Sequence, residues 1–406
     1  MALIVQKYGG TSVADTDRIK MVAERVVSAV SKGDKVIVVV SAMAGETDKF
    51  ERLASEITDS PDEREMDLLL SSGERVASAL TAMAIQKLGY ESMSLTGRQV
   101  GIVTNSAHTK AMIEHIEASR LKAALDDNKI PVVAGFQGIN EFSDVTTLGR
   151  GGSDTTAVAI AAALNADICE IYTDVEGVFT SDPRIVSDAK KMEKISYDEM
   201  LEMASLGAKV LHGRAVEFAK KYNVPLVVRS SFSHSPGTLV TKEDGEMEKI
   251  VVTGVTQEKN QARITIMGVP DRPGIAAAVF NAVSGANINV DMIVQNVSSD
   301  DHATDISFTV SKADGNKAFE ITKKVSDDMG TRGVNMNLEV AKVSIVGVGM
   351  QSHYGVAAQM FDTLSREGIN IMMISTSEIK ISCIIDEHDI DKSAKVLHDS
   401  FELAKE

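Results

Sequence analysis

The chain has 406 residues, 44% of them hydrophobic and 25% charged, and a formal net charge of −16. This length suffices for two or three globular domains, and the negative charge argues against nucleic acid or an anionic membrane as the main partner. No apolar stretch approaches the ~18–20 residues of a membrane span, and the N-terminus lacks the pattern of a signal peptide, so we expect a soluble cytoplasmic protein. The two cysteines, Cys169 and Cys383, lie in apolar runs and are expected to be reduced core residues.

The first segment, MALIVQKYGGTSVAD, places a lysine and a glycine pair directly after a short apolar strand. Lys7 falls where the strand ends, and Gly9 and Gly10 allow the backbone to turn sharply and approach a ligand. Thr16 and Asp17 are expected to start the following helix. Strand, cation, glycine turn and helix in this order suit an anion, most simply phosphate.

Strand and helix patterns then alternate over the first ~230 residues. Helices are predicted over 16–33, 65–89, 116–128 and 153–166, and strands over 35–43, 92–97, 129–136, 167–175 and 225–231. This order predicts an α/β fold in which helices cover a mostly parallel sheet, with ligands bound at the carboxyl ends of the strands.

A polar, turn-rich stretch at 233–249 indicates a linker, and an internal repeat with an offset of about 80 residues follows it. ARITIMGVPDRPGIAAAVFNAVSGANINVDMI corresponds to AKVSIVGVGMQSHYGVAAQMFDTLSREGINIMMI. Each copy predicts a strand, a glycine turn, an amphipathic helix and a second strand. One helix cannot cover both strands well, so we expect the copies to pack on each other or on another subunit, as a ligand-sensing module.

Four polar segments follow predicted strands in the first half: KYGGTS, SAMAGET, TLGRGGSD and YTDVEGVFTSDPR. Any one of them could be an ordinary turn, but together in one α/β domain they suit phosphoryl transfer, which needs cations and backbone N–H groups around the phosphates. Ser153 is expected to cap the Ala-rich helix after GRGG. Glu74 follows a break in its helix pattern and is either solvated or turned toward a ligand. The Walker, Rossmann, zinc and Gly-x-Ser-x-Gly patterns are absent.

KYGGTSVAD, LGRGGSD, TDVEGVFTSDPR and LGAKVLHGRAVEFA, in this order, resemble the motifs of the monofunctional bacterial aspartate kinases, and the duplicated C-terminal unit resembles their paired ACT domains. The resemblance covers essentially the whole chain. It implies an amino-acid-kinase-like three-layer sandwich over residues 1–245, followed by two α+β, ferredoxin-like ACT domains over 246–335 and 336–406. The implied reaction is ATP-dependent phosphorylation of the side-chain carboxylate of L-aspartate to 4-phospho-L-aspartate, with Mg²⁺ held largely by the phosphates. This reaction is the first step towards lysine, threonine, methionine and diaminopimelate.

The resemblance also implies roles for individual residues. Lys7 would bridge the phosphates and Asp154 would organise the site around it. The residues implied on the nucleotide side are Lys7, Tyr8, Gly9, Gly10, Thr173, Asp174, Phe179, Arg184 and Lys209. The residues implied on the aspartate side are Ser41, Thr47, Glu74, Arg150, Gly151, Gly152 and Ser153. The residues implied in an effector pocket for lysine and/or threonine are Asp271, Gly274, Ile275, Ala276, Asn289, Val294 and Gln295, completed by Asn370 and Ile371 of the second repeat.

The sequence departs from the family at two places: Phe179 replaces a usual tyrosine, and Tyr354 stands where proline is common. The resemblance implies a homo-oligomer, or a tetramer with a regulatory subunit made separately from an internal start at Met247, paired through the ACT domains. Two alternatives remain open. The same fold could phosphorylate another acceptor, such as glutamate or a carbamate, or the chain could be an amino-acid sensor with a decayed kinase domain.

Overall fold

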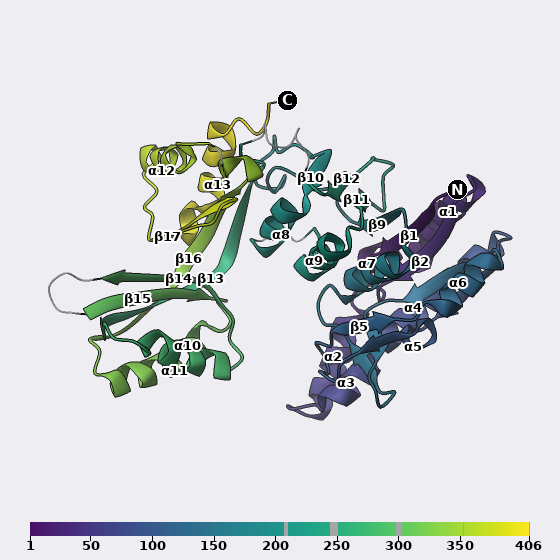
Figure 1. Ribbon diagram of the computed structural model, residues 1–406, viewed down its shortest axis with the longest axis horizontal. Coiled ribbons are helices and arrows are strands. Elements are labelled where there is room, and N and C mark those ends of the chain that lie inside the picture. The colour runs from purple at the N-terminus through teal and green to yellow at the C-terminus, as the bar shows by residue number, and fades with distance from the viewer. Residues whose placement is uncertain (207–209, 244–250, 298–302, 352, 406) are drawn as a thin grey trace. The chain divides into compact units, whose positions relative to one another are not determined.

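The computed structural model describes residues 1–206, 210–243, 251–297, 303–351 and 353–405 (Figure 1). The chain forms two compact units. The first comprises residues 1–178, 191–204 and 209–244, and the second comprises 179–190, 205–208 and 245–406. Within the described residues, no helix combines the length and apolar character needed to cross a membrane.

The first unit alternates strands and helices along the chain. Its elements are β1 (Leu3–Tyr8), the 3-10 turn η1 (Gly10–Val13), α1 (Thr16–Ser31), β2 (Lys35–Val40), α2 (Glu46–Ile57), α3 (Glu63–Leu70), α4 (Ser72–Lys87), β3 (Ser92–Leu95), α5 (Gly97–Val100), β4 (Ile102–Thr104), β5 (Ile113–Ile116), α6 (Ser119–Asp126), β6 (Ile130–Ala134), β7 (Gln137–Ile139), β8 (Val145–Thr147), α7 (Gly152–Leu164), β9 (Ile168–Thr173), β10 (Lys194–Ser196), α8 (Tyr197–Ser205), α9 (Gly213–Tyr222), β11 (Leu226–Ser230) and β12 (Thr238–Thr241).

The central sheet of this unit has the strand order β10-β12-β11-β9-β1-β2-β6-β3. Its pairs are parallel, except for the antiparallel pair of β11 and β12. The predicted α/β fold with a mostly parallel sheet is therefore confirmed. Because β1 lies between β2 and β9, with Lys7 in register with Val39 and Ile171, the loops that follow these three strands emerge at the same edge.

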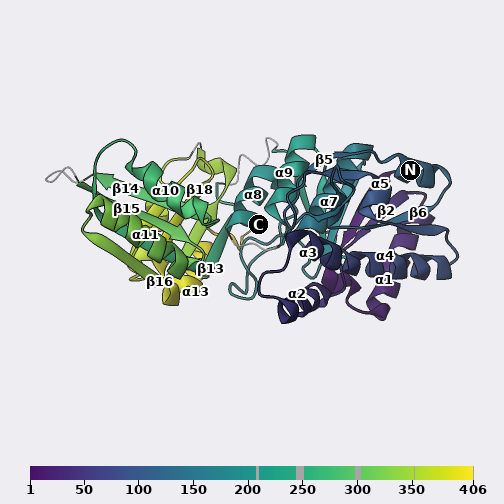
Figure 2. The ribbon, with the colours of Figure 1, turned by 90° about the horizontal axis from the view of Figure 1, so that it is seen from below.

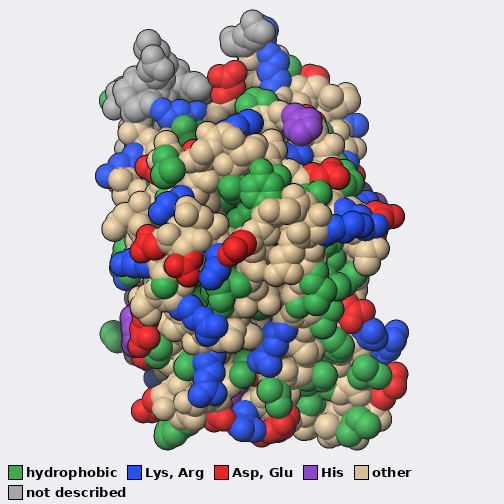
Figure 3. Space-filling view, turned by 90° about the vertical axis from the view of Figure 1, so that its right-hand side faces the viewer, with side chains coloured by type: hydrophobic (Ala, Val, Ile, Leu, Met, Phe, Trp, Pro, Cys, Tyr) green, Lys and Arg blue, Asp and Glu red, His purple; other side chains and the backbone are tan. Residues whose placement is uncertain are grey.

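Helices cover both faces of this sheet (Figure 2). On one face, α1 and α4 pack over Tyr8, Val38 and Val40 in a continuous apolar cluster. On the other face, α7 packs against β1 and β9. Successive side chains of a strand point to opposite faces, so neighbouring residues of β1 pack against helices on opposite sides of the sheet. The molecular face in Figure 3 shows acidic and basic side chains interspersed over its surface.

The helix boundaries confirm two expectations and correct one. α1 begins at Thr16, as predicted, and is capped by Asp15, whose carboxylate accepts the backbone N–H groups of Asp17 and Arg18. The N-cap of α7 is Gly151, and Ser153 lies inside the helix, so its predicted role as a cap is wrong. The predicted break before Glu74 is confirmed, since α3 ends at Leu70 and α4 begins at Ser72.

A small second sheet with the order β5-β4-β7-β8 was not anticipated from the sequence. Its strands have three or four residues each, too short to display a period of two. It is tied to α3 through Asp67, which is fully buried and accepts hydrogen bonds from the backbone N–H of Thr109 and the hydroxyl of Thr147.

The second unit is built from the repeat. Its elements are β13 (Gly254–Pro270), α10 (Ile275–Gly285), β14 (Val290–Val297), β15 (Ala303–Val310), α11 (Gly315–Met329), β16 (Gly333–Val346), the 3-10 turn η3 (Val348–Gln351), α12 (Val356–Arg366), β17 (Met373–Thr376), β18 (Lys380–Asp386), the 3-10 turn η4 (Glu387–Asp389) and α13 (Ile390–Ser400).

The two copies share one six-stranded antiparallel sheet of order β14-β15-β13-β16-β18-β17. The joint between them is the pairing of β13 with β16, which extends from Gly254–Val346 to Met267–Gly333. The expectation that the copies pack on each other is therefore confirmed. Cys169 of the first unit and Cys383 of the second are buried free thiols, as predicted.

Candidate active site

Lys7 and Asp154 meet on the α7 face of the central sheet. Lys7 Nζ lies 2.5 Å from Asp154 Oδ1, and the two side chains are only 10% and 13% exposed. The buried Oδ1 makes no well-directed hydrogen bond to any described residue, so the contact is mainly one of charge. Away from bulk water such a pair interacts more strongly than on the surface, and it fixes the ammonium group at the end of β1.

The glycine turn after β1 packs against the ends of both neighbouring strands. The backbone N–H of Gly9 donates to the carbonyl of Tyr172 in β9 over 3.1 Å. A Cβ on Gly10 would lie 2.9 Å from the carbonyl oxygen of Ala42, after β2, so only glycine fits there without a shift. Thr173 ends β9 and donates its hydroxyl to the exposed Asp174 over 3.1 Å. Of the residues predicted on the nucleotide side from β1 and β9, Lys7, Gly9, Gly10, Thr173 and Asp174 therefore lie at one edge. The side chain of Tyr8 does not, because it is fully buried in the apolar cluster under α1 and α4.

The GRGGSD segment forms the N-terminus of α7. Gly149 and Gly151 have φ of 74° and 71°, in the left-handed region that favours glycine. A Cβ on Gly151 would lie 2.2 Å from the His212 ring, so space and backbone conformation both require glycine. No side chain caps the helix, and Arg150 is exposed just before it. Free N–H groups, the helix dipole and an arginine together favour a carboxylate or phosphate here.

Glu74 lies beside the loop after β2. It is 4% exposed, and its Oε1 accepts the backbone N–H of Ala42 over 3.0 Å, whereas its Oε2 is buried with no hydrogen-bond partner among the described residues. Burial raises the pKa of this carboxyl to about 7, although the hydrogen bond from Ala42 opposes the shift. A buried carboxylate with a spare oxygen suits a cationic ligand group. Ser41 and Thr47, in the same loop and the first turn of α2, are half-buried.

Other predicted residues lie elsewhere. Phe179 and Arg184 belong to the second unit, where Arg184 pairs with Asp182 over 2.6 Å, and their nucleotide role stays a prediction. Lys209 and Met247 lie outside the described residues. The predicted effector residues all lie in the second unit.

Within that unit, the predicted effector residues come from the start of α10 and from the segments around β14 and β17. Strands β14 and β17 contact each other through a cluster that contains Met292, Val340, Met373 and Ile384. Segments from both repeats that carry predicted effector residues are thus brought together.

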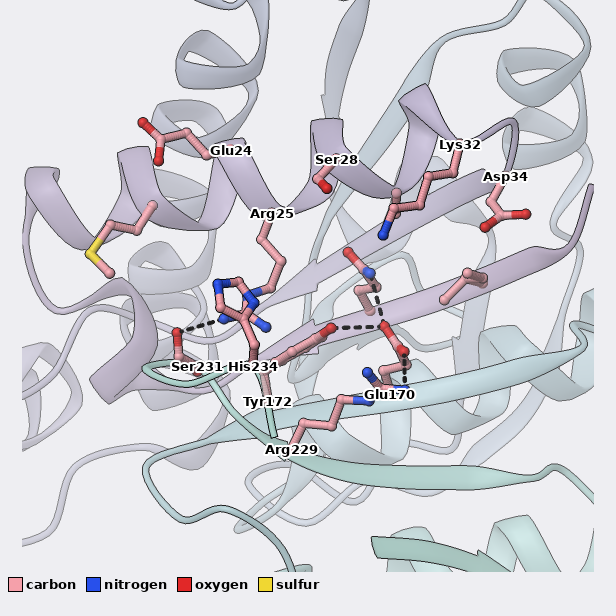
Figure 4. Close-up of a pocket in the computed structure, with 14 residues that line it drawn as sticks. Glu24, Arg25, Ser28, Lys32, Asp34, Glu170, Tyr172, Arg229, Ser231 and His234 are labelled. Atoms are coloured by element: carbon pink, nitrogen blue, oxygen red, sulfur yellow. Dashed lines mark hydrogen bonds and ion pairs between the residues drawn. The ribbon is translucent and has the colours of Figure 1, made fainter. Parts of the chain in front are cut away.

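Sequence reasoning missed a polar network on the α1 face of the same strands. The carboxylate of Glu170 accepts hydrogen bonds from Gln6 Nε2 and the Tyr172 hydroxyl, both over 2.9 Å, and pairs with Arg229 over 3.2 Å. Figure 4 shows Tyr172 and Arg229 converging on Glu170. The available signal was a polar residue, Gln6, Glu170 or Arg229, within each of three strands that otherwise consist largely of apolar residues.

The geometry around Lys7 combines a fixed cation, a glycine turn, an uncapped helix N-terminus and a buried carboxylate. Phosphoryl transfer requires such groups, since charge spread over the phosphoryl oxygens must be stabilised while donor and acceptor are held in line. Glu74 and Arg150 add groups of opposite charge that suit the ammonium and carboxylate of an amino acid.

Comparisons with known proteins agree with this chemistry. Residues 2–230 match the amino acid kinase family, and residues 264–324 and 343–401 match the ACT domain. The aspartokinase of Corynebacterium efficiens is 52% identical over 407 residues, covering 99% of this chain and 97% of that protein. E. coli aspartokinase III in complex with aspartate and ADP (R-state) has a TM-score of 0.80 and 27% identity, covering 98% of this chain and 99% of its own. The same enzyme in complex with lysine and aspartate (T-state) has a TM-score of 0.76 and the same identity and coverage.

Proposed function

This chain belongs to the aspartokinases, within the amino acid kinase family, and from that premise we propose how its residues divide the phosphorylation of the L-aspartate side-chain carboxylate by ATP. The observation that carries the proposal is the pairing of Lys7 with Asp154 at the edge where the loops of β1, β2 and β9 emerge. ATP would lie over the glycine turn, and aspartate would lie between Arg150 and Glu74.

In this arrangement Lys7 stabilises the charge on the transferring phosphoryl group. Asp154 holds the lysine in place and keeps it from turning toward solvent. Glu74 accepts the ammonium group of aspartate with its free Oε2, and Arg150 with the N-terminus of α7 takes the α-carboxylate. The side-chain carboxylate then points at the γ-phosphate and attacks it directly, without a covalent enzyme intermediate.

We further propose Mg²⁺ as the metal that accompanies ATP. Within the part of the chain that the structure describes, the one group of three metal-ligating side chains is in the second unit, at Asp188, His398 and Asp399, and none gathers around Lys7. This fits a cation bound mainly by phosphates and water, to which the exposed Asp174 after β9 would add a carboxylate oxygen. Bound there, the metal would neutralise phosphate charge.

The acceptor is tested by trapping the acyl phosphate with hydroxylamine in the presence of MgATP and L-aspartate, L-glutamate or carbamate. We expect hydroxamate with aspartate and background values with the other two. A larger yield with glutamate or carbamate would reassign the acceptor. If none of the three acceptors supports ATP turnover, the sensor alternative is favoured.

We also propose that lysine, threonine or both act as feedback effectors through the second unit. The support is the match to the ACT domain in both repeats, together with the bound lysine of the E. coli relative. A ligand selective for the folded protein raises its melting temperature, so a thermal-shift panel of lysine, threonine and methionine is a direct test. No shift with any of them, up to millimolar concentration, would remove this part of the proposal.

Pairing of chains through the ACT domains is proposed as well. β14 and β17 are the two edge strands of the shared sheet, and each exposes an isoleucine, Ile293 by 52% and Ile374 by 41%. Although β14 and β17 contact each other, these two isoleucines leave an exposed apolar surface that another chain would cover. Light scattering of the purified chain gives the stoichiometry, and a monomer at micromolar concentration would contradict the pairing.

A further inference from the structure

A second pocket lies in the first unit, on the face of the sheet opposite Lys7. It has a volume of about 450 Å³, within the range of small-molecule sites. Its floor is formed by β1, β9 and β11, its wall by α1, and one end by Ser231 and His234. Gln6 faces this pocket while the adjacent Lys7 faces Asp154, so the two sites use opposite sides of one strand.

The floor of this pocket is polar but internally neutral. Glu170 is 6% exposed, and its negative charge is balanced by Arg229. Its remaining hydrogen-bonding capacity is used by Gln6 and Tyr172. Any net charge presented to a ligand must therefore come from other residues.

Arg25 of α1 and Lys32, the C-cap residue of this helix, supply positive charge to the pocket. Glu24 and Asp34 also line it, and Asp34 Oδ1 accepts the backbone N–H of Ala2 over 2.9 Å. Figure 4 shows Arg25 and Lys32 extending from the helix toward the strands, whereas the carboxylate of Glu24 is turned away from them. Among the described residues, neither cation has a carboxylate within ion-pair distance. Arg25 donates to the carbonyls of Ser231 and Ser233, over 3.3 and 2.9 Å, and lies over the Tyr172 ring, so its charge is held in place without a carboxylate partner among the described residues.

The spacing of these two cations indicates how far apart the charged groups of a ligand would lie. Seven residues of α-helix separate Arg25 from Lys32, which is about 10 Å along the axis. We propose that this pocket is a second ligand site and that it binds a small organic dianion, with one charged group at Arg25 and the other at Lys32. Dicarboxylates and bisphosphorylated molecules share this chemistry.

An occupant would touch strands that also carry the active-site loops. Tyr172 accepts the backbone N–H of Gly9, and the Ser231 hydroxyl is hydrogen-bonded to that of Ser12 in the turn after the glycine pair. The pocket is therefore connected through single residues to the predicted phosphate loop, and the KM for ATP is the kinetic quantity that binding would change.

Isothermal titration calorimetry on the full chain tests the site, with MgADP and aspartate present at saturation so that the active site is filled. The probes are octanedioate for the carboxylate source, fructose 1,6-bisphosphate for the phosphate source, and glucose 6-phosphate as a ligand with one charged group. We expect binding of at least one dianion and weaker binding of the single-group probe. Which dianion binds identifies the source.

The variants are Arg25→Gln and Lys32→Gln, with Lys20→Gln as the matched control. Lys20 lies on α1 outside the pocket and pairs with Asp17, so the control changes net charge equally. Loss of one charge-assisted contact should weaken binding about tenfold or more in each pocket variant and leave it unchanged in the control. Lys32 makes no side-chain hydrogen bond among the described residues, so its variant should fold even if Arg25→Gln does not.

Two outcomes would overturn the proposal: no heat from either dianion at millimolar concentration, or binding that Lys32→Gln leaves unchanged. Failure of ADP or aspartate to bind would instead count against the proposed kinase site. The two failures are thus distinguishable.

Discussion

Lys7 Nζ lies 2.5 Å from Asp154 Oδ1, so the ammonium group at the end of β1 is held by a carboxylate in the first turn of α7. The contact joins the strand that precedes the glycine turn to the helix that follows the GRGGSD segment. The active-site proposal depends on this contact.

Replacing Lys7 with alanine should lower kcat by at least ~10²–10³-fold, the scale for removing one key electrostatic group. Steady-state kinetics with MgATP and aspartate measure the loss, and circular dichroism checks the fold. Lys20→Ala, on the exposed side of α1, is the control and should retain full turnover. A Lys7→Ala enzyme with near-normal kcat would contradict the assignment.

The KM for aspartate should depend on pH through Glu74. Its pKa is raised to about 7 by burial, so below that pH the free enzyme holds a neutral carboxyl that cannot pair with an ammonium. We expect KM to rise by up to about tenfold per pH unit below pH 7, and to be high and independent of pH in Glu74→Gln. Glu51→Gln, on the exposed side of α2, should behave as wild type. If the KM of Glu74→Gln depends on pH as in the wild type, Glu74 does not bind the ammonium group of aspartate.

The same pKa shift predicts a pH dependence of stability. The folded pKa of Glu74 lies above its unfolded value of 4.5, so from about pH 4.5 to 7 the unfolded chain releases this proton and the folded chain keeps it. The free energy of unfolding should therefore fall with rising pH across this window, by about 3 kcal/mol from this group. Urea denaturation at several pH values measures it, and the decline should be absent from the Glu74→Gln profile. Parallel profiles for both proteins would refute the assignment.

Gly151→Ala and Gly33→Ala separate backbone strain from steric conflict. Both glycines have positive φ, 71° and 96°, but a Cβ on Gly33 meets nothing within 4 Å, whereas one on Gly151 lies 2.2 Å from the His212 ring. Gly33→Ala should cost about 1–2 kcal/mol of unfolding free energy. Gly151→Ala should cost more and also raise the KM for aspartate, because it displaces the start of α7. Equal losses in both variants would show that the clash is relieved without moving the site.

Asp271→Ala should weaken the response to lysine or threonine and leave uninhibited catalysis intact. Asp271 is exposed, in the turn between β13 and α10, and belongs to the second unit. The test is the melting-temperature shift with each amino acid, together with kcat in its absence. Loss of kcat itself would contradict the division of labour between the two units.

Sequence patterns predicted six of the eight strands of the central sheet, β1, β2, β3, β6, β9 and β11, because their apolar runs are long enough to recognise. They missed β10 and β12, which have three and four residues, and β12 lies inside the stretch at 233–249 that we interpreted as a linker. They predicted neither β4, β5, β7 and β8, which are too short, nor Gly151 as the N-cap of α7, where packing against His212 decides. Lys7, Gly9 and Gly10 could be singled out because their motif is local. The partners of Glu170 could not be predicted, because they come from three strands whose neighbours only the fold defines.

The ladder between β13 and β16 makes the two repeats a single piece of architecture. Removing either copy would leave a long row of unpaired backbone amides on the other, so we expect the two repeats to fold and unfold together. An insertion, a truncation or a register shift in one repeat would therefore also disrupt the strand pairing of the other.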